Sequence, residues 1–250
     1  MTSEAPRVGV YGGTFDPIHV AHLRAAEEVA EALGLAQVVF VPSGQPPHKD
    51  VRRLASGEPD PIAPAALRLA WVRDAIAGNA RFTVSPVVVD RDCRSYRVLP
   101  LDDPRDALAP ARLVFVLGRD AFQEMGSWRE PRRLLTLADF AVTTRPPVEP
   151  RTDRLDAWLP ACARDDFDVA GDGMSAVHRA AATELRLVPI TAIDVAATDV
   201  RARIRAGRSV RYLVPDAARD AIERSGAYAP DGCRTTGAKS ASTRPGRDDA

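Results

Sequence analysis

Two histidines stand three residues apart in the stretch GGTFDPIHVAH, which runs from residue 12 to residue 22. Residues three apart lie on one face of a helix, so His19 and His22 can present two imidazole rings to one ligand. Imidazole can donate hydrogen bonds to phosphate oxygens or bind a metal, but no third metal ligand of comparable placement is evident. Two surface histidines are the alternative, although only four histidines occur in the chain and two of them fall here.

Gly12 and Gly13 open the same stretch, directly after the apolar run 8–11. Glycine has no Cβ atom, so the backbone here can approach a ligand closely, and the helix expected from Val20 would direct its free amides at an anion. The spacing matches neither GxGxxG nor GxxxxGK[ST], which excludes the dinucleotide fingerprint and the P-loop. A plain tight turn is the alternative for the two glycines.

Short apolar runs alternate with helical stretches along most of the chain. Strands are expected at 7–11, 37–41, 82–89, 113–117, 139–143 and 185–188, and helices at 20–33, 63–77, 131–137, 198–206 and 216–225. This alternation predicts an α/β fold, a Rossmann-like doubly wound parallel sheet with its ligand site beyond the carboxyl ends of the strands. Residues 148–183 do not fit the pattern and are interpreted as an irregular insertion. We expect one domain at 7–228 and a disordered tail at 229–250, which has almost no large apolar residue.

The composition is that of an ordinary globular protein, with 45% hydrophobic residues, 27% charged residues and no formal net charge. Bulk charge therefore gives no reason to expect binding to nucleic acid or to an acidic membrane. Three cysteines without CxxC spacing indicate neither a disulfide framework nor a zinc site. With no signal-peptide pattern and no run of 18 apolar residues, a cytoplasmic location is expected. Lysine occurs only at Lys49 and Lys239, which draws attention to Lys49.

Four segments carry a family resemblance. GGTFDPIHVAHL resembles the first signature of bacterial nicotinate-mononucleotide adenylyltransferases, whose core motif is HxGH, and VPSGQPPHK, LGRDAFQEMGSW and IDVAATDVR resemble three further family segments in the same order. The resemblance covers residues 7–228 and implies a fold of the nucleotidyltransferase type. It also implies transfer of the adenylyl group of ATP to nicotinate mononucleotide in NAD biosynthesis, with release of pyrophosphate.

The resemblance implies a role for each matching residue. The catalytic residues would be His19 and His22 on the α-phosphate, Lys49 on the ATP phosphates, and Arg201 on the β- and γ-phosphates. ATP would also be bound by Gly12, Gly13, Thr14, Phe15, Gly118, Asp120 and Thr198, and the mononucleotide by Ser95, Tyr96, Arg97, Trp128 and Arg145. Trp128 would stack on the pyridine ring. Without the resemblance, Trp128 is equally well a core residue and Asp120 a helix N-cap. Mg²⁺ would arrive with ATP, and no protein metal site is expected.

The chain departs from the family pattern at three places. Ala21 stands where HxGH has glycine, and Ala196-Ala197 replaces the two serines of SSTxxR, at a cost of about 1 kcal/mol of phosphate binding for each lost hydrogen bond. The family segment SYTxDTL reads SYRVLPL here, so Arg97 could pair with the nicotinate carboxylate or mark a changed substrate. Two alternatives stay open: a catalytically impaired paralogue that binds nucleotide, and adenylyl transfer to a different phosphate acceptor.

Overall fold

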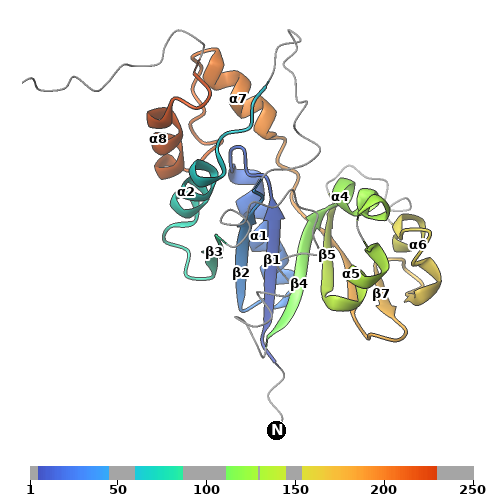
Figure 1. The fold of residues 1–250 in the computed structure, drawn as a ribbon. Coiled ribbons are helices and arrows are strands. Elements are labelled where there is room, and N and C mark those ends of the chain that lie inside the picture. Colours follow the sequence, from blue (N-terminus) through green and yellow to red (C-terminus); the bar gives the residue numbers. More distant parts are fainter. Residues whose placement is uncertain (1–4, 45–59, 87–110, 129, 145–153, 230–250) are drawn as a thin grey trace, which may run out of the picture.

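An eight-stranded sheet forms the centre of the protein, which is described here from a computed structural model (Figure 1). The structure describes residues 5–44, 60–86, 111–128, 130–144 and 154–229. The strands are β1 (Arg7–Gly13), β2 (Gln37–Pro42), β3 (Phe82–Val84), β4 (Arg112–Gly118), β5 (Asp139–Thr144), β6 (Phe167–Val169), β7 (Ser175–His178) and β8 (Glu184–Pro189). The helices are α1 (Val20–Leu33), α2 (Ala65–Ile76), α4 (Arg119–Gln123), α5 (Pro131–Leu137), α6 (Leu155–Trp158), α7 (Ala197–Arg205) and α8 (Asp216–Ser225), with two 3₁₀ turns, η1 (Glu124–Ser127) and η2 (Arg164–Asp166).

The order in which the chain adds strands to the sheet reverses between β1 and β4. The order across the sheet is β3-β2-β1-β4-β5-β8-β7-β6, so the chain first moves outward from β1 to β3 and then resumes on the other side of β1. β1 is parallel to both of its neighbours, β2 and β4. In doubly wound sheets ligands bind outside the carboxyl ends of the strands at such a switch point. The glycine stretch after β1 and Gly118 at the end of β4 both lie there.

The edge of the sheet differs from the predicted parallel arrangement. β7 is antiparallel to β8, and β6 is antiparallel to β7. Both strands come from the segment that the sequence indicated as an irregular insertion, so that interpretation was wrong for its described part. The strands are only three and four residues long, too short to produce a clear alternating pattern. The other predicted strands and helices are confirmed, with bounds within two residues, except that the strand expected at 82–89 ends at Val84 and residues 87–89 lie outside the described part.

Successive side chains of the strands point to opposite faces of the sheet and form two hydrophobic layers, one on each face. In β2, Val38 and Phe40 face the layer covered by α1, α2 and α8, while Val39 and Val41 face the layer covered by α4, α5 and α6. This pattern is typical of a sheet that is buried on both faces, and it holds the carboxyl ends of the strands in register. The helix α1 ends at Gly34, whose φ of 60° is the left-handed conformation expected of a helix C-cap. Within the described ranges, no helix is long and apolar enough to cross a membrane.

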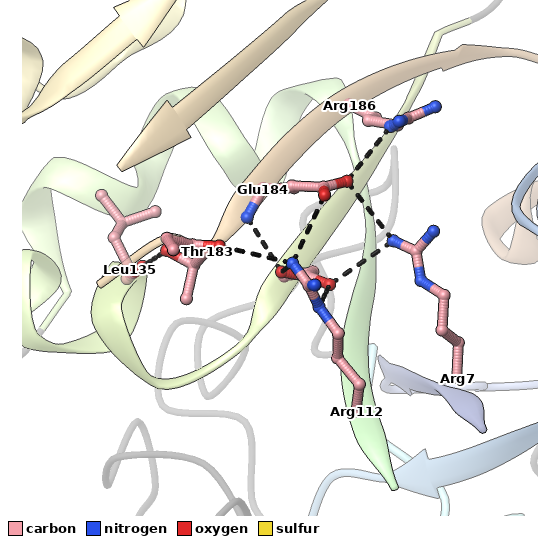
Figure 2. Close-up of polar contacts among 8 residues, drawn as sticks. Arg7, Arg112, Leu135, Thr183, Glu184 and Arg186 are labelled. Carbon is pink, nitrogen blue, oxygen red and sulfur yellow. Dashed lines mark hydrogen bonds and ion pairs between the residues drawn. The ribbon is translucent and has the colours of Figure 1, made fainter. Parts of the chain in front are cut away.

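A cluster of charged side chains joins four adjacent strands at their amino ends (Figure 2). Asp139, at the start of β5, is 2% exposed and accepts hydrogen bonds from Arg112 Nε (2.5 Å) and Nη2 (2.9 Å). It also accepts from Arg7 Nη2 (3.4 Å) and from the backbone amide of Glu184 (2.8 Å). Arg7, Arg112 and Glu184 begin β1, β4 and β8, so one carboxylate ties the starts of the strands on both sides of the switch point.

Neutralising this carboxylate should destabilise the fold. We expect Asp139→Asn to lower the free energy of unfolding by roughly 1–3 kcal/mol, because the two partly buried guanidinium groups lose the nearer of the two carboxylates that they share, Glu184 being the other. Urea unfolding followed by circular dichroism measures this. Asp168→Asn is the matched control, since Asp168 is 70% exposed and paired with an exposed Arg179, and it should change stability by less than about 0.5 kcal/mol. Equal effects of the two substitutions would contradict the role of the cluster.

Candidate active site

The glycine stretch between β1 and α1 is shaped by the ring of Phe15. A Cβ atom on Gly13 would lie 2.7 Å from that ring, closer than side chains allow, so glycine is required at this position. Phe15 has a φ of 48°, and its ring lies 2% exposed between Tyr11, Phe40 and His22, at centroid distances of 5.8, 5.7 and 5.1 Å. The loop therefore folds back on itself through a packed ring. The ligand contact predicted for Gly12 and Gly13 stays a prediction, beside this packing reason for Gly13.

The two histidines stack on each other at the start of α1. His19 is the N-cap residue, His22 occupies the third helical position, and their ring centroids are 3.7 Å apart. His19 is 3% exposed and His22 half-buried, so the alternative of two surface histidines does not hold for His19. The backbone amide of His19 donates to Nδ1 of His22 (3.2 Å). In a neutral ring this acceptor role at Nδ1 places the proton on Nε2, and His22 becomes a hydrogen-bond donor at Nε2.

The first amides of α1 are largely engaged inside the protein. The amide of Val20 donates to the carbonyl of Leu213 (2.9 Å), in the connection between α7 and α8, and the amide of His22 donates to the carbonyl of His19 (3.0 Å). The expectation that this helix start directs free amides at an anion was therefore wrong for these two groups.

Arg201 is held in a buried ion pair next to the glycine stretch. Its side chain is 2% exposed, and its Nε and Nη2 donate to Oδ2 of Asp60 (3.2 and 2.8 Å). Its Nη1 donates to the carbonyl of Asp16 (2.7 Å), while Arg205 donates to the other oxygen of Asp60. Three of the five N–H groups of Arg201 are thus used by the protein itself. The structure brings Arg201 to the turn that carries the histidines, and its predicted contact with the ATP phosphates stays a prediction.

The carboxylate of Asp16 connects this turn to two further parts of the chain. Its Oδ1 accepts from the backbone amide of Ala63 (3.1 Å), just before α2, and from the hydroxyl of Tyr228 (2.5 Å), just after α8. Sequence reasoning missed Asp16, Asp60 and Tyr228 as residues that hold the site. Only Asp16 could have been suspected, because it lies inside the GGTFDPIHVAH stretch.

A second group of predicted residues follows β4. Gly118 is the N-cap of α4, and Asp120 lies exposed in its first turn, so the N-cap alternative for Asp120 is not observed. A Cβ atom on Gly118 would come no closer than 4.0 Å to Thr143, so packing does not require glycine there. Trp128 is half-buried just after η1 and packs against the hydrophobic layer covered by α4, α5 and α6, so the alternative of a core residue stays open. These residues lie one strand away from the glycine stretch, at the same edge of the sheet.

Two of the remaining predicted residues, Thr14 and Thr198, are described, and the others are not. Thr14 is half-buried and directly follows β1. Thr198 is exposed in the first turn of α7, whose N-cap Ala196 offers no side-chain hydrogen bond. The 190–196 loop that leads to α7 is fastened to α1, because Glu28 accepts from both the amide and the hydroxyl of Thr191 (2.6 Å each). Burial acts to raise the pKa of Glu28, but these hydrogen bonds and Arg24 outweigh it and hold the pKa below its ordinary value.

Five predicted residues lie outside the described part: Lys49, Ser95, Tyr96, Arg97 and Arg145.

Metal-binding side chains do not gather in the described ranges. No group of three or more histidine, cysteine, aspartate or glutamate residues there could hold a metal ion. The turn that carries His22 is also contacted by the buried cation Arg201, through the carbonyl of Asp16, at the switch point of a doubly wound sheet. Such an arrangement suits the stabilisation of charge on a bound phosphate.

Comparison with known families agrees with this fold and site. A sequence model of the family described as cytidylyltransferase-like matches residues 10–203, which run from β1 into α7. The matched range includes the glycine stretch, both histidines and Arg201. The fold and the site thus define a nucleotidyltransferase of the cytidylyltransferase-like class.

Two curated relatives narrow the class. A protein of Thermomicrobium roseum named as a probable nicotinate-nucleotide adenylyltransferase is 39% identical over 89% of this chain and 91% of its own length. A protein of Rubrobacter xylanophilus with the same name is 38% identical over 92% of this chain and 96% of its own length. The chain belongs to the nicotinate-nucleotide adenylyltransferase family. A solved structure of the Plasmodium falciparum nicotinic acid mononucleotide adenylyltransferase complexed with NaAD shares the fold, with a TM-score of 0.59 and 14% identity over 89% of this chain and 97% of that one.

Removing one hydroxyl should loosen the turn that carries the histidines. Tyr228 is 2% exposed and donates to the buried Asp16 carboxylate, so we expect Tyr228→Phe to lower the free energy of unfolding by about 1.5–3 kcal/mol. Urea unfolding measures the change. Tyr212→Phe is the control, because Tyr212 is 81% exposed and its loss of a hydroxyl should fall within about 0.5 kcal/mol of no change. A Tyr228→Phe protein as stable as the parent would show that the bond does not hold the turn.

Proposed function

We propose that this chain transfers the adenylyl group of ATP to nicotinate mononucleotide, giving nicotinate adenine dinucleotide and pyrophosphate in NAD biosynthesis. The observation that carries the proposal is the stacked His19–His22 pair at the switch point of the sheet. The amide of His19 donates to Nδ1 of His22, which in a neutral ring leaves the proton on Nε2. The names and chain coverage of the curated relatives support the same activity. A cytoplasmic location, expected from the sequence, agrees with such a role and stays a prediction.

The reaction needs positioning and charge stabilisation rather than a covalent enzyme intermediate. A phosphate oxygen of the mononucleotide attacks the α-phosphorus of ATP in line, the bond to the bridging oxygen breaks, and pyrophosphate leaves with that electron pair. His22 donates from Nε2 to a non-bridging oxygen of the α-phosphate, where negative charge grows in the transition state. His19, stacked against His22, would likewise bond an oxygen of the α-phosphate.

The other proposed contacts surround the triphosphate and the acceptor. The ammonium group of Lys49 would pair with the ATP phosphates, and Thr198 would donate its exposed hydroxyl from the start of α7. We propose that Arg201 serves the β- and γ-phosphates from its buried position beside Asp60. Gly118 and Asp120 would contact the adenosine ribose, while Trp128 would stack on the pyridine ring. Ser95, Tyr96, Arg97 and Arg145 complete the proposed mononucleotide site.

A divalent cation accompanies ATP in nucleotidyltransferases of this family, and we propose that it is Mg²⁺ here. Since the described residues provide no cluster of metal ligands, the phosphates themselves would hold most of the ion. When bound, the cation neutralises charge on the phosphate oxygens. The residues of the chain then contribute orientation and the donor proton of His22.

Removing the imidazole of His22 should abolish most of the activity. We expect His22→Ala to lower kcat by at least about 100-fold, as for the loss of one transition-state donor, while the protein stays folded. Pyrophosphate release from ATP with nicotinate mononucleotide measures it. His178→Ala is the matched control, because His178 is 7% exposed and its Nδ1 caps the turn at Ala180 and Ala181 next to β7. It should reduce stability but not kcat, and a His22→Ala enzyme with parental kcat would disprove the assignment.

The choice between acid and amide acceptors should depend on charge. Nicotinate mononucleotide carries a carboxylate where nicotinamide mononucleotide carries an amide of nearly the same shape, so a charge-assisted bond gives about 10- to 100-fold preference for the acid. We expect the parent to prefer the acid in kcat/KM and Arg97→Gln to reduce that ratio. Arg94→Gln, in the same segment, should leave it unchanged. A parent that prefers the amide, or another phosphate acceptor, would refute the acceptor assignment, whereas an unchanged ratio in Arg97→Gln would refute only the role of Arg97.

A further inference from the structure

Arg68 is a fully buried cation beneath the carboxyl ends of β1 and β2. It lies in the first turn of α2 and is 1% exposed. Its guanidinium group donates to four backbone carbonyls: Nε to Ala63 (2.9 Å), Nη1 to Thr14 (2.6 Å), and Nη2 to both Ser43 (2.7 Å) and Gly44 (2.6 Å). No role for this residue follows from the sequence motifs that indicated the active site.

The carbonyls that Arg68 gathers belong to the two loops that begin the proposed triphosphate site. Thr14 directly follows β1, and Ser43 and Gly44 directly follow β2. The ends of these neighbouring strands are themselves paired, with Gly13 opposite Pro42 and the amide of Ser43 donating to the carbonyl of Gly13 (2.8 Å). A single side chain therefore holds the first described residues after both strands.

The direction of these carbonyls decides what the loops offer to an anion. In a trans peptide the C=O and the following N–H point in opposite directions, and the bonds at these positions are not cis. When Arg68 draws the carbonyls of Thr14 and Ser43 toward itself, the amides of Phe15 and Gly44 turn away from it. The negative ends of these peptide dipoles thereby point toward Arg68, and their positive ends point away from it, which favours an anion on that side. The buried charge of Arg68 adds a positive potential that solvent screens weakly.

We propose that Arg68 is a positioning residue for the triphosphate of ATP. It contacts no substrate in this proposal, which rests on the proposed function. By holding the carbonyls of Thr14, Ser43 and Gly44 inward, it orients the backbone that surrounds the ATP phosphates. A residue with this role should affect the binding of ATP more than the binding of the mononucleotide ring or the stability of the distant strand edge.

Two substitutions at position 68 separate this role from simple packing. Arg68→Met keeps most of the buried chain but removes the charge and all donors, and Arg68→Lys keeps the charge with fewer, differently directed donors. We expect the Kd for ATP in isothermal titration calorimetry to rise about 10- to 100-fold in Arg68→Met, as for the loss of charge-assisted bonds, and by an intermediate factor in Arg68→Lys. The KM for ATP should rise in parallel, while the KM for nicotinate mononucleotide changes little.

Arg112→Met is the matched control at the amino ends of the strands, the end of the sheet opposite to Arg68. Arg112 donates two hydrogen bonds to Asp139, so this variant should lower the melting temperature without changing the Kd for ATP. A folded Arg68→Met protein that binds ATP as the parent does would overturn the proposal. So would an Arg112→Met protein that loses ATP affinity to the same extent. If Arg68→Met does not fold, Arg68→Lys decides, and a parental Kd in that variant overturns the role of the carbonyl contacts.

Because the calorimetric titration uses ATP alone, it tests the role of Arg68 independently of whether the proposed reaction takes place. If the parent chain releases no pyrophosphate from ATP in the presence of nicotinate mononucleotide, the proposed reaction fails. The effect of Arg68 on the binding of ATP alone is still measured by calorimetry, and it supports or refutes the positioning role by itself.

Discussion

The buried residue Asp16 is the point at which the separate parts of the candidate site meet. Its carboxylate accepts hydrogen bonds from the start of α2 and from Tyr228, and its carbonyl accepts one from Arg201 in α7. A buried carboxylate is stable only when it is well paired, so these bonds constrain one another. The loop that contains Asp16 also carries Phe15, whose ring contacts His22. The orientation of the histidines therefore depends on bonds that the histidines do not make.

Most of the fold could be predicted from the sequence, because its central strands are continuous apolar runs and its helices have clear periodicity. Val38 to Val41 are buried on both faces of the sheet, which is why an uninterrupted run marks that strand so well. The antiparallel edge could not be predicted. In β6 and β7 an inward residue such as Ala176 alternates with an exposed one such as Val177 over only a few positions, and so short a pattern is not distinguishable from a loop.

The candidate site was predictable where a residue type has few other uses, as for the histidines and the paired glycines. The residues that support it were not, because their partners are remote in sequence. Arg68 and Asp60 are charged residues of the kind that usually lies at the surface, and composition alone assigns them there, while Arg201 was predicted only as a phosphate contact and not as a buried partner. Only the folded chain shows that Arg201 and Asp60, 141 positions apart, form a buried pair. The reason for Gly13 was also hidden, since it depends on the packing of the Phe15 ring.

The bond between Tyr228 and Asp16 has a consequence for the order in which the molecule is made. It joins residues 212 positions apart, and a ribosome synthesises the chain from its amino end. The glycine stretch and both histidines therefore leave the ribosome long before their last buried partner exists. Contacts of such large sequence separation form late in folding, because a long loop must close before they contribute. Nascent chains that stop short of α8 lack this bond, and the turn bearing the histidines acquires its final hydrogen bond only when nearly the whole domain is present.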